Sequence, residues 1–198
     1  LDIKKVSNLD YSSYSPNGFT ALNDALMEAI EDCENRLASS KAKTKPQVIV
    51  VVFTDGEENA SKKFTNKDEI KKRRADKESD GWAFIFMGAD MDAWSSSSSY
   101  GMSAGNTIRL GKQAIAQAAN YLTNRTRKAA RLFASNETGS MNDAQYTASM
   151  SNLMSIDEED MKNDAEAVNL RSALDSSVKS STLNDTKKTH FVSGMRKI

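Results

Sequence analysis

The chain has 198 residues and a mass of 21.8 kDa, with 27 basic and 27 acidic side chains, so its formal net charge is zero. A balanced charge excludes a global field that would attract nucleic acid or an anionic membrane, and the single Cys33 and single His190 exclude a disulfide framework and a two-His metal site. Hydrophobic residues make up 38% of the chain, below the roughly 45–50% usual in globular domains, so we expect part of it to lie outside a packed core.

The first predicted elements lie before residue 60. Residues 15–18 predict a turn, and apolar side chains spaced about one helical turn apart over 21–37 predict a helix with Thr20 as its N-cap. Residues 47–54 are largely β-branched and do not alternate with polar residues. This pattern is typical of a central strand in a parallel sheet that is covered on both faces. Asp55 follows directly and ends the strand.

The next stretch of the chain repeats this alternation. Residues 65–79 predict a charged surface helix, 82–87 a second buried strand, 94–99 a short helix or turn, 106–110 a short edge strand, and 112–134 a long helix. Strands that alternate with helices predict an α/β fold, a three-layer Rossmann-like parallel sheet with helices on both faces. In such sheets ligands bind at the carboxyl ends of the strands.

The composition changes near residue 135. Residues 1–135 read as the folded α/β domain, whereas residues 136–198 are rich in Ser, Thr and Asn, with Tyr146 and Phe191 as their only aromatics. Two interpretations of this polar extension stay open: a tail that becomes ordered only against a partner, or an arm that docks through short apolar clusters. The residues that would form these clusters are Leu153, Met154, Ile156, Met161, Ala165, Val168 and Leu174.

Three motifs follow one another in the folded part. They are Tyr14 and Pro16 followed by GFTALNDA (18–25), then VIVVVFTDGEENAS (48–61), then GWAFIFMGADMDA (81–93). At these residues the chain resembles the von Willebrand factor A (VWA) family, and most of all its stand-alone bacterial and phage members. The motifs appear in the family's order and at family-like spacing over most of the predicted α/β domain.

The resemblance implies a metal-ion-dependent adhesion site, called MIDAS in this family. It assigns Thr20 as the hydroxyl ligand and Asp55 as the acidic ligand of Mg²⁺. A hard cation such as Mg²⁺ prefers oxygen ligands, keeps several waters, and leaves a position open for a partner's carboxylate. Taken without the resemblance, Thr20 is equally a helix cap and Asp55 equally a turn residue.

The chain departs from the family at its start. The family's first strand carries D-x-S-x-S, which supplies further ligands, and no such strand precedes Tyr14. We expect the missing strands in an upstream part of the same protein. A circular permutation, in which residues 136–141 (NETGSM) replace that motif, is the lesser alternative. Two ligands alone predict a partial or degenerate site that binds Mg²⁺ weakly or has lost it, and strand 48–53 then lacks one neighbour.

Three functions stay open. We expect a non-enzymatic protein–protein interaction module of VWA type that serves as a structural or assembly component. Its protein partners would belong to a multi-subunit assembly, with no nucleic-acid or membrane partner. Its location would be a phage virion or the cytoplasm of an infected bacterium. The second hypothesis is a metal-free structural scaffold. The third is a Mg²⁺- or Mn²⁺-dependent hydrolase, against which the chain lacks a phosphate-binding loop; its carboxylates would be Asp55, Glu57, Glu58, Asp90 and Asp92.

Overall fold

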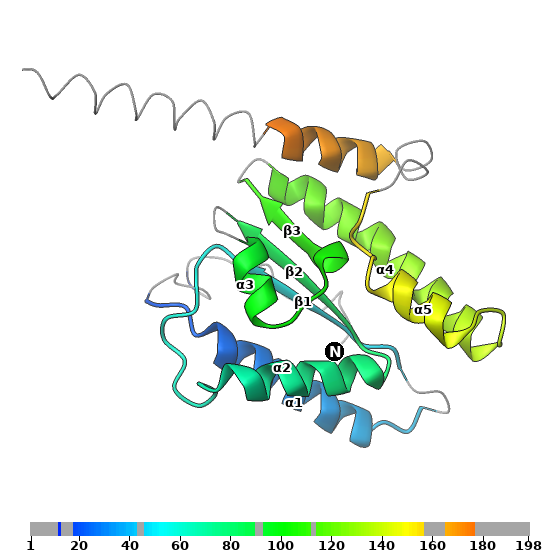
Figure 1. Ribbon diagram of the computed structural model, residues 1–198, viewed down its shortest axis with the longest axis horizontal. Coiled ribbons are helices and arrows are strands. Elements are labelled where there is room, and N and C mark those ends of the chain that lie inside the picture. Colours follow the sequence, from blue (N-terminus) through cyan, green and yellow to red (C-terminus); the bar gives the residue numbers. More distant parts are fainter. Residues whose placement is uncertain are drawn as a thin grey trace, which may run out of the picture.

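The computed structural model describes residues 12, 18–42, 46–89, 93–111, 114–156 and 165–176. In chain order, and as Figure 1 labels them, the elements are helix α1 (Leu22–Ala38), strand β1 (Ile49–Thr54), α2 (Lys67–Ser79), β2 (Ala83–Ala89), α3 (Ala93–Ser99), the short 3₁₀ helix η2 (Ala104–Asn106), β3 (Thr107–Leu110), α4 (Ile115–Glu137) and α5 (Asp143–Met150). A further helical stretch covers 165–176.

The described strands form one parallel sheet in the order β1-β2-β3. Val51 of β1 is paired with Ile85 of β2, and Met87 of β2 is paired with Ile108 of β3. β3 therefore lies at one end of the sheet, as the short run at 106–110 predicts. Parallel strands need crossover connections, and α2 supplies the first of them between β1 and β2.

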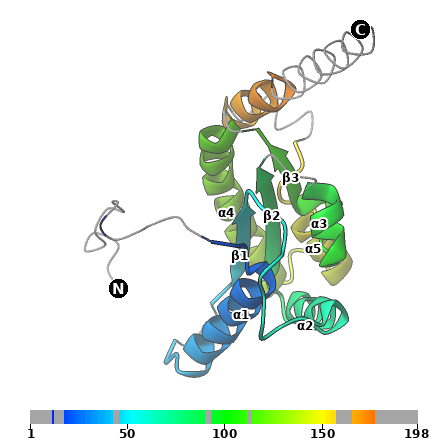
Figure 2. The same cartoon turned by 90° about the vertical axis from the view of Figure 1, so that its left-hand side faces the viewer.

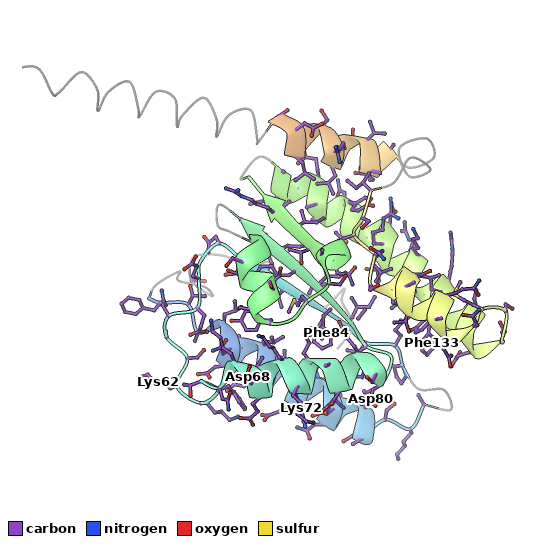
Figure 3. The ribbon with its side chains drawn as sticks, viewed as in Figure 1. Lys62, Asp68, Lys72, Asp80, Phe84 and Phe133 are labelled. Carbon is purple, nitrogen blue, oxygen red and sulfur yellow. The ribbon has the colours of Figure 1, made fainter. Side chains whose placement is uncertain are left out.

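Helices α1 and α2 cover one face of the sheet. The apolar side chains that pack together there include Leu26 and Ile30 of α1, Ile70 of α2, Val50 and Val52 of β1, and Phe84 and Phe86 of β2. Figure 3 shows Phe84 in the layer between the sheet and α2. This cluster forms the core on the first face.

Helix α4 and the helix over 165–176 cover the other face. The apolar side chains packed there include Ile85 and Met87 of β2, Ile108 and Leu110 of β3, Ala118 and Tyr121 of α4, and Ala167 and Leu170 of the last helix. Figures 1 and 2 show α4 on the other side of the sheet from α1 and α2. The predicted α/β architecture, a parallel sheet with helices on both faces, is thus confirmed, and it is compatible with a Rossmann-like arrangement.

Strand β1 differs from its prediction in one respect. The continuous apolar run at 47–54 predicts an interior strand covered on both faces, and this prediction is wrong because β1 ends the described sheet. Val52 is buried on the α1 side, whereas Val51 is 39% exposed and Phe53 is 52% exposed on the α4 side. The outcome instead fits the expectation that this strand lacks one neighbour.

Part of the polar extension packs on the sheet domain. Leu153 and Met154 are buried, and the Met154 N–H donates to the carbonyl of Gly105 at 3.0 Å. The Asn106 side-chain amide donates to the carbonyl of Met150 at 2.8 Å. The approach is so close at Gly105 that an added Cβ would lie 2.2 Å from the Asn152 Oδ1 atom. The turn after α5 is therefore fixed to the start of β3.

The last described helix uses a different face from the one that the apolar spacing indicates. Ala167 and Leu170 are fully buried against the sheet, whereas Ala165 is exposed and Val168 is 40% exposed. Leu174 is half-buried against the same cluster. Met161 lies outside the described residues.

Candidate functional site

The two predicted metal ligands come from separate segments at the carboxyl end of β1. Thr20 lies just before α1, and Asp55 directly follows β1. The Thr20 N–H donates to the Asn59 side-chain carbonyl at 2.8 Å, and the Asn59 N–H donates to the Thr20 carbonyl at 3.0 Å. This reciprocal pair holds the first loop against the loop after β1, at the edge of the sheet where the fold predicts a site.

Gly56 brings the Thr20 hydroxyl close to the backbone beside Asp55. A Cβ built on Gly56 would lie 2.7 Å from the Thr20 Oγ1 atom, so a larger residue there would displace this hydroxyl. The Thr54 hydroxyl fixes the turn because it donates to the Gly56 carbonyl at 2.8 Å and accepts from the Gly56 N–H at 3.2 Å. The structure thus brings Thr20 and the Asp55–Gly56 turn together on one rim.

Both predicted ligands have free oxygen atoms within the described part of the chain. The Thr20 side chain is half-buried and the Asp55 side chain is exposed. Neither the Thr20 hydroxyl nor the Asp55 carboxylate makes a hydrogen bond or ion pair with any described residue. These two groups are therefore available to an external ligand.

The prediction that Thr20 caps the first helix is wrong. Ala21 is the N-cap of α1, and its side chain makes no capping hydrogen bond. The cap comes instead from Glu58, whose carboxylate accepts from the Asn23 N–H at 2.7 Å and from the Ser61 hydroxyl at 2.7 Å. A carboxylate at this position also interacts favourably with the helix dipole. Thr20 is thereby released from the capping role.

Further N–H groups of the same loop surround the Glu58 carboxylate. The N–H groups of Ala60 and Ser61 donate to it at 2.9 and 2.8 Å. Partial burial acts to raise the pKa of Glu58, but the hydrogen bonds from Asn23 and Ser61 outweigh it and hold this pKa below its usual value. Glu58 is therefore an ionised structural group at neutral pH.

Asp24, in the first turn of α1, in turn accepts hydrogen bonds from the loop after β1. Its carboxylate accepts from the N–H groups of Lys62 and Phe64, both at 2.8 Å, and of Lys63 at 3.1 Å. Hydrogen bonds from the Lys62 and Phe64 backbone lower the pKa of Asp24. The first turn of α1 and the loop after β1 thus cap each other through two carboxylates, a role that sequence reasoning missed although both residues lie inside the quoted motifs.

A buried pair of polar side chains, Tyr100 and Asn23, also holds the start of α1. The Tyr100 hydroxyl donates to the Asn23 side-chain carbonyl at 2.6 Å, and Asn23 is 3% exposed. Burial, followed by the nearby charge of Glu58, raises the pKa of Tyr100 to about 12, so this hydroxyl stays protonated. Arg74 donates through Nε to the Tyr100 carbonyl at 2.8 Å. The start of α1 is therefore held on two sides.

The donor set suits a hard cation but is incomplete. A hydroxyl and a carboxylate are oxygen donors of the kind that Mg²⁺ accepts, and Mg²⁺ commonly keeps several waters beside one or two carboxylates. Among the described residues, no group of three or more His, Cys, Asp or Glu side chains could hold a metal ion. Asp24 and Glu58 already accept several hydrogen bonds. Thr20 and Asp55 would therefore supply only two of the ligands that an octahedral Mg²⁺ site needs.

The carboxylate cluster expected for a hydrolase is not assembled within the described residues. Glu58 serves the α1 cap, Glu57 is exposed, and Asp90 and Asp92 lie outside the described residues. The permutation alternative is contradicted by the fold. Residues 136–141 begin inside the last turn of α4 instead of ending a strand. Leu132 of α4 packs near Ala83 at the start of β2, so this end of α4 lies at the opposite edge of the sheet.

Comparison with family models, curated proteins and solved structures returned no significant match. The resemblance to VWA proteins thus rests on the three sequence motifs. No helix in the described part of the chain is both long enough and apolar enough to cross a membrane. The class that the structure itself defines is an α/β protein with a parallel sheet and helices on both faces.

Proposed function

We propose that this protein is a protein–protein interaction module of VWA type, which serves as a structural component of a larger assembly such as a phage virion. The rim formed by Thr20 and Asp55 is its contact site for a protein partner, with Mg²⁺ between them. One observation supports this most strongly: the Thr20 hydroxyl lies against Gly56, next to Asp55, and the two side chains have no partner among the described residues.

The chain's own residues would prepare this contact. The carboxylates of Asp24 and Glu58 hold the two loops together, which keeps the Thr20 hydroxyl beside the Asp55–Gly56 turn. A bound Mg²⁺ would supply a positive centre for a carboxylate of the partner. With a neutral hydroxyl as one ligand, that centre would keep most of its charge for the partner's carboxylate.

The test is direct metal binding by isothermal titration calorimetry with Mg²⁺ and Mn²⁺. Thr20→Val and Asp55→Asn should each weaken binding at least tenfold, because each removes one of two protein ligands. Glu57→Gln is the matched control, since it removes an exposed carboxylate from the same loop. Equal binding by all three variants, checked for folding by circular dichroism, would show that metal is held elsewhere.

A metal-free scaffold is the second candidate. It is favoured by the engagement of Asp24 and Glu58 in hydrogen bonds, which leaves Thr20 and Asp55 as the ligands that the motifs assign on this rim. In that case no heat of Mg²⁺ binding is measured at millimolar metal. The Thr20→Val and Asp55→Asn variants would then enter the assembly at wild-type levels, which separates this function from the metal-dependent one.

A further inference from the structure

The outer side of α4 carries three basic side chains, Arg127, Lys128 and Arg131, which we call the basic face. Arg127 and Arg131 are exposed, and Lys128 is half-buried. Successive residues turn by about 100° around a helix, so Arg127, which is two residues from both the buried Arg125 and the buried Ala129, lies on the side away from the sheet. Figure 2 shows α4 at the outside of the molecule, with the sheet on its inner side. The basic face therefore lies on the surface.

The acidic residues of α4 do not neutralise the basic face. Glu137, the last residue of α4, is its only Asp or Glu, and the positions one turn from Arg127 and Arg131 are neutral or basic. In α1, by contrast, Arg36 is paired with Asp32 one turn away at 2.7 Å. Within the described part of the chain, the basic face makes no ion pair.

The stability of α4 itself does not account for this cluster. Like charges four residues apart, such as Arg127 and Arg131, destabilise a helix. The helix dipole favours basic residues in the last turn, and the last turn of α4 contains none. Arg127 donates through Nη1 to the Asn124 side-chain carbonyl at 3.1 Å, which leaves its Nη2 without a partner among the described residues. The basic face thus keeps donors for an external group.

We infer that the basic face binds an acidic helix of a protein partner, on which Asp or Glu side chains lie one turn apart. Arg127 and Arg131 are four residues apart, so carboxylates with the same spacing on a facing helix meet both guanidinium groups at once. Each guanidinium can hold a carboxylate through two parallel hydrogen bonds, and the charges of the two helices are complementary. The inference is independent of the metal site, because α4 and α1 cover opposite faces of the sheet.

The surroundings of the basic face favour an acidic protein over nucleic acid or a membrane. None of the exposed side chains of α4 is aromatic, so bases find no surface on which to stack. Three cations also neutralise too few phosphates for tight binding at physiological salt. The exposed neighbours Asn120, Thr123 and Ala130 are small, so this side of α4 offers no large apolar side chain for insertion into a bilayer.

The first experiment measures binding of the full chain to a labelled helical peptide of Glu and Ala, with Glu one turn apart. Fluorescence anisotropy is recorded at low ionic strength, where screening is weak. Arg127→Glu combined with Arg131→Glu should weaken binding at least tenfold, and this double variant should instead bind the peptide in which Lys replaces Glu. Such a reversal distinguishes a direct contact from misfolding.

The matched control is Lys41→Glu combined with Lys67→Glu, which changes the net charge equally at two exposed sites outside α4. It should bind the Glu peptide as the wild-type chain does. Absence of binding by the wild-type chain, or equal losses in the two double variants, overturns the inference.

The second experiment separates the alternative occupants. A peptide of the same composition with Glu scattered around the helix should bind at least threefold more weakly. Duplex DNA and phosphatidylserine vesicles should bind at least tenfold more weakly than the helical peptide. Equal binding of the two peptides, or tighter binding of DNA or vesicles, contradicts an acidic helix as the partner. Self-association in sedimentation equilibrium that is lost with Arg127→Glu and Arg131→Glu would assign the face to a second copy and overturn the inference.

Discussion

Strands β1 and β2 are both apolar and adjacent, yet their surroundings differ. Every residue of β2 is buried, whereas β1 alternates between buried and exposed residues along its length. Within the described residues the difference comes from position: β2 has a strand on each side and helices on both faces, whereas β1 is paired with β2 alone and has exposed side chains on its α4 side. An unbroken apolar run therefore predicts a strand but does not determine how many of its faces are covered.

The largest expected effect comes from the buried strand. Phe86 is 0% exposed and stacks on Tyr100 with ring centroids 6.5 Å apart. Phe86→Ala removes the ring and leaves a cavity, so it should lower the free energy of unfolding by about 3–5 kcal/mol. Urea unfolding followed by circular dichroism measures this. Phe86→Leu keeps most of the volume and should cost clearly less. A loss below about 1 kcal/mol for Phe86→Ala would mean that β2 is not the centre of the core.

The parts of the fold that the sequence predicts are those that depend on local pattern. The alternation of strands and helices follows from short apolar runs such as 82–87 and from helical spacing such as that over 21–37. Coverage of β1 is not local, because it depends on which segments pack beside it. The last helix shows the same limit: several helical phases place apolar residues on one side, and packing buries Ala167 and Leu170.

The second prediction concerns the loop that ties the end of β1 to α1. Glu58→Gln replaces a carboxylate that accepts four hydrogen bonds with an amide that can accept only part of them, one of these donors being the Asn23 N–H. We expect a loss of about 1–2 kcal/mol in the free energy of unfolding at pH 7. Glu57→Gln is the control, since Glu57 is exposed, and it should change stability little.

The pH dependence of this effect has a definite sign. The pKa of Glu58 is lowered in the folded protein, so its carboxylate binds protons more weakly there than in the unfolded chain. Its contribution is complete above the unfolded pKa of about 4.3 and is lost as the pH falls through the lower folded value. The stability gap between wild type and Glu58→Gln should therefore shrink between pH 5 and pH 3 in urea titrations. A gap that widens on acidification would contradict the assigned role.

The candidate site was predictable in its positions and less so in its roles. The rule that ligands bind at the carboxyl ends of parallel strands places Asp55 at the rim, and the structure brings Thr20 there. The capping of α1 was not predictable from local sequence. The capping residue, Glu58, lies 35 positions along the chain from Asn23, whose N–H donates to it, whereas the local pattern indicated Thr20.

The smallest expected effect is that of Phe53→Ala, which is compared with Met87→Ala at a matched pair of positions in the two strands. Phe53 of β1 and Met87 of β2 are register partners on the same sheet face, yet Phe53 is 52% exposed and Met87 is 4% exposed. Met87→Ala should cost about 2–5 kcal/mol. Phe53→Ala should cost less than about 1 kcal/mol, mostly through lower strand propensity.

These two variants differ in what surrounds the side chain rather than in secondary structure, since both sit in the same paired stretch of the sheet. The ratio of their losses in the free energy of unfolding therefore reports how far the α4-side face of each strand is covered. Comparable losses for Phe53→Ala and Met87→Ala would mean that the α4-side face of β1 is covered within a single chain in solution.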